Sequence, residues 1–126
     1  MKRDYDLIRL ILIDIENNVQ EWSEAIKSRA GKDTQVINGH VELLVDHGEV
    51  KYPKDPKTGR HQVLGNGYWM PMMCKLTMEG HDLLDDIRDP SVFKKLKDKV
   101  NSVGGQVSLH VFKTLAAETF KSAIGL

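Results

Sequence analysis

The sequence predicts a mostly helical α+β domain, and three observations carry that prediction. Apolar residues recur at helical spacing in several separate stretches. Two short stretches rich in β-forming residues, 50–52 and 68–76, flank a segment with proline and glycine turn chemistry, which predicts a hairpin. At 126 residues, with 40% hydrophobic and 29% charged residues, the chain has the size and composition of one globular domain.

The first expected element is a helix over residues 4–17, which Asp4 or Asp6 can cap. Its apolar face contains Leu7, Ile8, Ile11, Leu12 and Ile15. Leu10 and Ile13 widen this face, which indicates a helix covered on more than one side. A second subunit could supply part of that cover.

Residues 18–34 favour a helix closed by Gly31, and a loop with one short strand is the alternative. Residues 35–48 predict a clear amphipathic helix, because Ile37, Val41 and Leu44 share a face and Gly48 supplies a stop. This central helix, 35–47, precedes the hairpin directly.

The hairpin is expected to consist of a strand at 50–52, a loop and a strand at 68–76. Pro71 within the second strand implies an edge position or a bulge. A helix over 77–88 follows at once, with Thr77 as its N-cap. Gly80 is expected to let this helix approach neighbouring backbone closely; the alternative is a tolerated helix glycine.

Two more helices complete the chain. Pro90 suits a first helical position, and Val92, Phe93, Leu96 and Val100 give that helix an apolar face. Gly104 and Gly105 break it. Ser108 then caps a final helix whose inward residues are expected to be Leu109, Phe112, Leu115, Ala116 and Phe120.

The order of helices followed by a hairpin and a covering helix is that of a winged helix-turn-helix with a β-hairpin wing and additional C-terminal helices. We expect a single domain over 1–126, with its core at 4–88 and a helical extension at 90–126. In this arrangement helix 35–47 is the recognition helix, and 50–76 is the wing.

Four stretches carry a family resemblance: "MKRDYDLIRLILIDIE", "INGHVELLVDHGEV", "LTMEGHDLLDDIRDPSVFKKLKDKV" and the closing "AIGL". They resemble a bacterial and phage family catalogued as domain of unknown function no. 2513, while residues 18–35 and 50–70 match poorly. The family is similar to winged-helix proteins in its element order. The resemblance implies this fold and carries no activity that can be transferred.

The candidate chemistry is binding of double-stranded DNA by a bacterial or prophage regulator. Gln35 and Asn38 face away from the apolar side of the central helix and can pair with adenine. The wing carries a basic group that can follow phosphates, consisting of Lys51, Lys54, Lys57, Arg60 and His61. A solvated helix face and a hairpin tip protected by lysines are the alternatives. Zero formal net charge, with Glu42 and Asp46 on the central helix, argues against DNA.

The alternative function is a winged-helix protein-interaction module without DNA binding, an adapter between phage and host proteins. Tyr68, Trp69 and Met70 are its candidate partner surface, and core packing is the competing explanation. A homodimer through the first and last helices is a further expectation.

Catalysis, a metal site and a cofactor are not expected, because the sequence shows no nucleophile motif, metal-ligand spacing or phosphate-cradling loop. Cys74 is expected to be an inert core thiol and His81 a half-buried packing residue. One cysteine and no bilayer-length apolar run predict a cytoplasmic protein.

Overall fold

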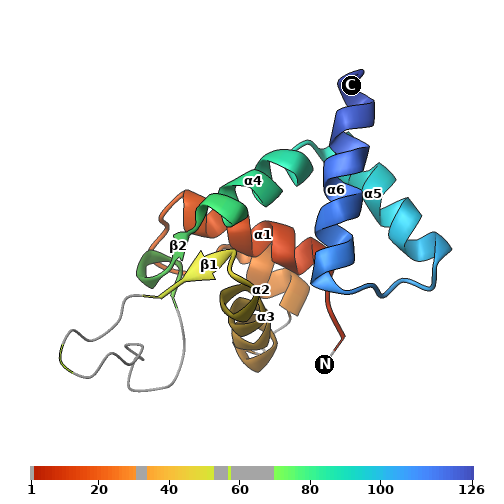
Figure 1. Ribbon diagram of the computed structural model, residues 1–126. Helices are drawn as coiled ribbons and strands as arrows, with labels where there is room; N and C mark the ends of the chain where they lie inside the picture. Colours follow the sequence, from red (N-terminus) through yellow and green to blue (C-terminus); the bar gives the residue numbers. More distant parts are fainter. Residues whose placement is uncertain (1, 31–33, 53–56, 58–69) are drawn as a thin grey trace.

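The computed structural model describes residues 2–30, 34–52, 57 and 70–126. The described elements are the helices α1 (Tyr5–Glu16), α2 (Glu24–Ala30), α3 (Thr34–His47), α4 (Met78–Ile87), α5 (Pro90–Ser102) and α6 (Leu109–Ala123), the strands β1 (Val50–Lys51) and β2 (Lys75–Leu76), and the 3-10 helix η1 (Pro71–Met73). The predicted class, a mostly helical α+β protein, is confirmed (Figure 1). No helix in these residues is long and apolar enough to cross a bilayer.

Helix α1 lies at the centre of the molecule, in contact with α2, α3, α4, β2 and η1 (Figure 1). Its residues Leu7, Ile11 and Leu12 are completely buried. Leu10 and Ile13 are partly buried and pack against the same core. The wide apolar face of α1 therefore follows from contacts with several elements of its own chain.

The helix starts agree with the predicted caps. Asp4 accepts from the backbone N–H of Leu7, Thr77 from that of Gly80, and Ser108 from that of Val111. Each cap satisfies a backbone donor that the first helical turn leaves without an intrahelical partner. Helix α2 is shorter than the predicted helix, and Gly31 lies outside the described residues.

The two strands form an antiparallel pair in which Val50 lies opposite Leu76 and Lys51 opposite Lys75. The predicted second strand over 68–76 is wrong at its centre, because Pro71–Met73 forms a 3-10 turn. Pro71 fixes its own φ and lacks an N–H, so it opens this helical turn well. Within the described residues 70–76, the strand is confined to Lys75–Leu76.

Helices α5 and α6 pack on each other, and α6 also packs on α4 (Figure 1). The predicted apolar face of α5 is confirmed, since Val92, Phe93, Leu96 and Val100 are buried. The inward face of α6 is confirmed for Leu109, Phe112 and Ala116, which are buried, and for Leu115, which is partly buried and packs against the core. It differs from the prediction at Phe120, which is partly exposed, and at Thr119, which is buried. Thr119 is accommodated because its hydroxyl donates to the carbonyl of Leu115 and accepts from Lys99.

Candidate nucleic-acid interface

Helix α3 presents a polar surface on the side away from the core. Ile37, Val41 and Leu44 are buried against the rest of the protein. The residues on the other side differ along the helix: Gln35 is exposed and Asn38 partly exposed near its start, whereas exposed Glu42 and Asp46 occupy its second half. The N-terminal half of α3 is therefore neutral and amide-bearing, and the C-terminal half is acidic.

The strand pair beside α3 carries two lysines on its outer face. Val50 and Leu76 are buried, and alternation along each strand sends Lys51 and Lys75 to the exposed side. The register places these two lysines directly opposite each other. Neither has a carboxylate partner within the described part of the chain.

The junction between α3 and β1 holds a completely buried carboxylate, that of Glu49. The ammonium of Lys113, on α6, lies 2.6 Å from Glu49 Oε1, and His47 Nδ1 lies 2.9 Å from the same oxygen. The backbone carbonyl of Glu49 accepts from the N–H of Thr77. These bonds fix the direction in which β1 leaves α3.

Sequence reasoning missed Glu49 because alternation with buried Val50 predicts an exposed side chain at position 49. It did identify the close approach next to it. A Cβ on Gly80 would lie 2.0 Å from the carbonyl oxygen of Glu49, so only glycine lets α4 start against β1. The expectation for Gly80 is confirmed.

Tyr52 and Cys74 lie buried under the strand pair. Burial raises the pKa of the Tyr52 hydroxyl, and the neighbouring Cys74, Glu42 and Asp46 raise it further. The acidic half of α3 therefore lies near the base of the hairpin. Burial also raises the pKa of the Cys74 thiol to about 12, so it is protonated at neutral pH, as expected for a core thiol.

The described residues contain only part of the predicted interface. Lys57 is exposed. Met70 is partly buried, and its carbonyl accepts from the N–H of Met73 at the start of η1. The remaining predicted residues lie outside the described part of the chain: Lys54, Arg60, His61, Tyr68 and Trp69.

His81 and the α5 lysines lie outside this surface. His81 was expected to be a half-buried packing residue; its side chain is 54% exposed, and its Nδ1 lies 4.0 Å from Glu16 Oε2 at the surface. Position 81 is exposed on α4, whereas Leu83 and Leu84 of the same helix are buried. The α5 lysines face several directions: Lys94, Lys95 and Lys99 are exposed, while partly buried Lys97 contacts Asp6.

The arrangement defines a class of protein: a small, mostly helical α+β domain in which a short antiparallel strand pair with two outward lysines follows an amphipathic helix. The chain belongs to the family described as "Hypothetical protein (DUF2513)", which matches residues 2–106. The family assignment expected from the sequence is thus confirmed. The matched region contains α1 to α5 and ends before α6.

A similar relative comes from Haemophilus influenzae (strain ATCC 51907 / DSM 11121 / KW20 / Rd), where it is described as "Uncharacterized protein". The two sequences are 28% identical over 117 residues, which are 92% of this chain and 92% of the relative. The similarity therefore extends over nearly the whole of both proteins. No solved structure matches this chain.

Proposed function

We propose that this protein is a non-catalytic DNA-binding protein of the winged helix-turn-helix type. Helices α2 and α3 would form the helix-turn-helix, and β1 with β2 would form the base of the wing. The element order, and the antiparallel pairing of the two strands directly after α3, support this proposal. We propose that the protein acts as a bacterial or prophage transcriptional regulator.

The observation that carries the proposal is the pairing of Lys51 with Lys75. Like charges directly opposite each other in an antiparallel pair destabilise it, by roughly 0.2–1 kcal/mol. Both side chains point outward, and neither has a carboxylate within the described part of the chain. A DNA phosphate between the two ammonium groups would relieve this repulsion, so the pair is better suited to the bound state than to the free one.

The charge distribution along α3 indicates how the helix would enter the major groove. Recognition helices contact base edges with their N-terminal residues. Gln35 and Asn38 lie in that half, and both side chains can pair with the N6 and N7 atoms of adenine. Glu42 and Asp46 lie in the other half, where they would repel phosphates. We therefore place the start of α3 deepest in the groove.

The test is fluorescence anisotropy of a labelled random duplex of about 20 base pairs, across about 50 to 200 mM salt. We expect the wild-type affinity to fall with salt. In the Lys51→Gln/Lys75→Gln variant the slope of log affinity against log salt should be shallower by about 0.9, because the one phosphate contact of this pair is lost and each phosphate contact contributes about 0.9. An absence of binding by the wild type at the lowest salt contradicts the proposal.

A matched control removes two lysines from another part of the protein. Lys95 of α5 lies with Ser122 and Ala123 of α6 around one hollow, and Lys121 is next to Ser122 in sequence, so both lysines lie near the C-terminal end of α6. In Figure 1 this end points away from α3 and the strands. The Lys95→Gln/Lys121→Gln variant should keep the wild-type slope. An equal loss of slope in this control would assign the effect to net charge alone.

A second candidate function is a protein-interaction module. It is favoured by two exposed apolar side chains near the strand pair, Met72 at 55% and Met78 at 78% exposure. The acidic half of α3 also suits a protein partner better than a phosphate backbone. Capture from a bacterial lysate, compared with a Met72→Ser/Met78→Ser variant, should then return a protein that the variant loses. Recovery of nucleic acid without protein contradicts this candidate.

A further inference from the structure

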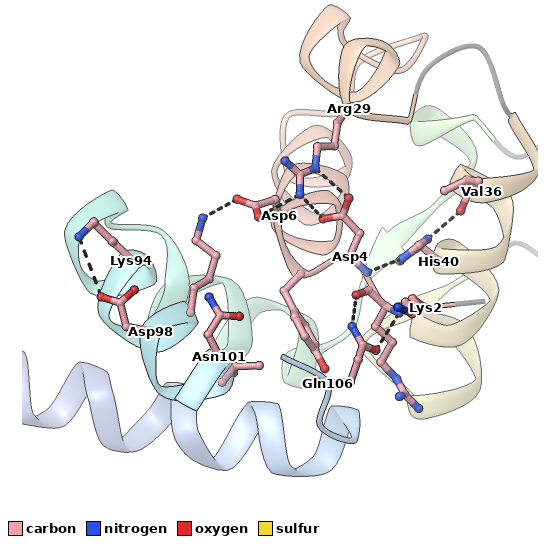
Figure 2. A pocket seen from close by; sticks show the side chains of 14 residues that line it. Lys2, Asp4, Asp6, Arg29, Val36, His40, Lys94, Asp98, Asn101 and Gln106 are labelled. Atoms are coloured by element: carbon pink, nitrogen blue, oxygen red, sulfur yellow. Dashed lines mark hydrogen bonds and ion pairs between the residues drawn. The ribbon is translucent and has the colours of Figure 1, made fainter. Parts of the chain in front are cut away.

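A groove of about 700 Å³ lies beside the N-terminal half of α3 (Figure 2). Its walls come from the N-terminal segment, α2, α3 and α5, and Gln106 lies at one edge. We call this hollow the arm groove and residues 2–4 the arm. The arm groove is large enough for a polar group of a ligand to enter between charged side chains.

The arm is held by hydrogen bonds to two distant elements. The amide of Gln106 accepts from the N–H of Arg3 at 3.1 Å and donates to its carbonyl at 2.9 Å. The N–H of Asp4 donates to Nε2 of buried His40 at 2.9 Å, while His40 Nδ1 donates to the carbonyl of Val36 at 2.8 Å. The backbone at Arg3 and Asp4 is therefore fixed between α3 and the loop after α5.

The positive and negative charges of the side chains around the arm groove do not cancel. Five cationic side chains and three carboxylates line it, which leaves a surplus of two positive charges. Each of the three carboxylates already has a cationic partner (Figure 2). Arg29 pairs with Asp4 at 2.8 Å and with Asp6 at 3.3 Å. Lys97 pairs with Asp6 at 2.9 Å, and Lys94 lies 3.9 Å from Asp98.

Asp4 is anionic at neutral pH. Burial alone would raise the pKa of its carboxyl, but the hydrogen bonds from Arg29 and from the N–H of Leu7 lower it overall. Of the five cationic side chains that line the groove, those of Lys2 and Arg3 have no carboxylate partner among the described residues. They belong to the arm, so the surplus charge sits on a backbone that is already ordered.

We propose that Lys2 and Arg3 bind a phosphate of the DNA duplex at the arm groove. This proposal rests on the proposed function and adds a second contact to it. His40 and Val36 border the groove in the N-terminal half of α3, whereas β1 follows the C-terminal end of the same helix. Phosphate contacts would therefore lie near both ends of the helix that enters the major groove, and the ordered arm loses little conformational entropy on binding.

The test measures the Lys2→Gln/Arg3→Gln variant of the full chain in the same anisotropy salt series. Loss of this one phosphate contact should make the slope shallower by about 0.9 and should weaken binding. The change should add to that of Lys51→Gln/Lys75→Gln, because the two groups contact separate phosphates. The backbone bonds to Gln106 and His40 do not use the substituted side chains, so thermal unfolding should be unchanged.

The outcomes separate the two proposals. If the wild type does not bind the duplex, both fail. If Lys51→Gln/Lys75→Gln reduces the slope and Lys2→Gln/Arg3→Gln leaves it at the wild-type value, the arm proposal fails and the proposed function stands. Calorimetric binding of pyrophosphate by the wild type and not by the arm variant, without an arm effect on DNA, would assign the groove to a free anion and overturn our proposal.

Discussion

Glu49 and Lys51 are two residues apart, yet their charged groups lie in opposite environments. The Glu49 carboxylate is completely buried and bonded to two cationic or polar side chains, from α3 and α6. Lys51 is exposed and lies opposite another lysine. The first charge joins elements of the fold, and the second is left for something outside the chain. We therefore locate stability at the Glu49 junction and binding on the lysine pair.

The largest expected effect comes from removing the ammonium that faces Glu49. Lys113→Met leaves the buried carboxylate with His47 as its side-chain partner. Loss of one partner of a buried pair costs about 3–5 kcal/mol, and we expect about 3 kcal/mol because His47 remains. Urea unfolding followed by circular dichroism measures this difference in the free energy of unfolding.

A second substitution checks the origin of that loss. Adding Glu49→Gln to Lys113→Met removes the unpaired charge, so the double variant should be more stable than Lys113→Met alone. If Lys113→Met costs under about 1 kcal/mol, the junction does not have the role that we assign to it.

A smaller loss is expected at the backbone contact of the same junction. Alanine at position 80 would gain about 1 kcal/mol of helix propensity. Its Cβ would, however, meet the Glu49 carbonyl oxygen at 2.0 Å, so α4 or β1 must move. Overpacking costs about 1–3 kcal/mol, and so short a contact belongs at the upper end of this range. With the gain of about 1 kcal/mol subtracted, we expect Gly80→Ala to lower the free energy of unfolding by about 2 kcal/mol.

The control for Gly80→Ala is an alanine on the outer face of the same helix. Asp82 is exposed, so Asp82→Ala should change the free energy of unfolding by less than about 0.5 kcal/mol. A Gly80→Ala protein as stable as the wild type would show that the start of α4 adapts without cost.

These two regions also show what a sequence can and cannot predict. The caps at Asp4, Thr77 and Ser108 depend on chemistry within one helical turn, and all three were predicted. The burial of Glu49 depends on Lys113, which is 64 residues away, and no local pattern indicates it. The 3-10 turn at Pro71–Met73 was missed because a run of apolar residues around one proline also fits a bulged edge strand.

In the candidate site, too, only the features that depend on a local sequence pattern could be predicted. Periodicity identified the polar face of α3, including Gln35 and Asn38. The opposition of Lys51 and Lys75 needs the strand register, in which buried Val50 lies opposite buried Leu76. Lys75 was therefore absent from the residues expected to bind DNA. The arm groove was missed for the same reason, since it joins residues about one hundred positions apart.

Lys75→Glu should have the smallest effect on stability and a large effect on DNA binding. It therefore tests most directly whether the lysine pair serves binding rather than stability. In Lys75→Glu the like-charge pair becomes an opposite-charge pair across the strands. We expect the free energy of unfolding to rise by about 0.5 kcal/mol, within the usual range for cross-strand pairs. DNA binding should weaken at the same time, with a salt slope shallower by at least about 0.9.

Lys75→Gln is the matched variant, because it removes the repulsion without adding attraction. It should give a smaller gain in stability and an intermediate loss of binding. A protein that is stabilised by Lys75→Glu and still binds DNA as the wild type does would remove the lysine pair from the interface. A protein destabilised by Lys75→Glu would instead show that the two ammonium groups do not repel each other in the free state, and the argument for an external anion would lose its basis.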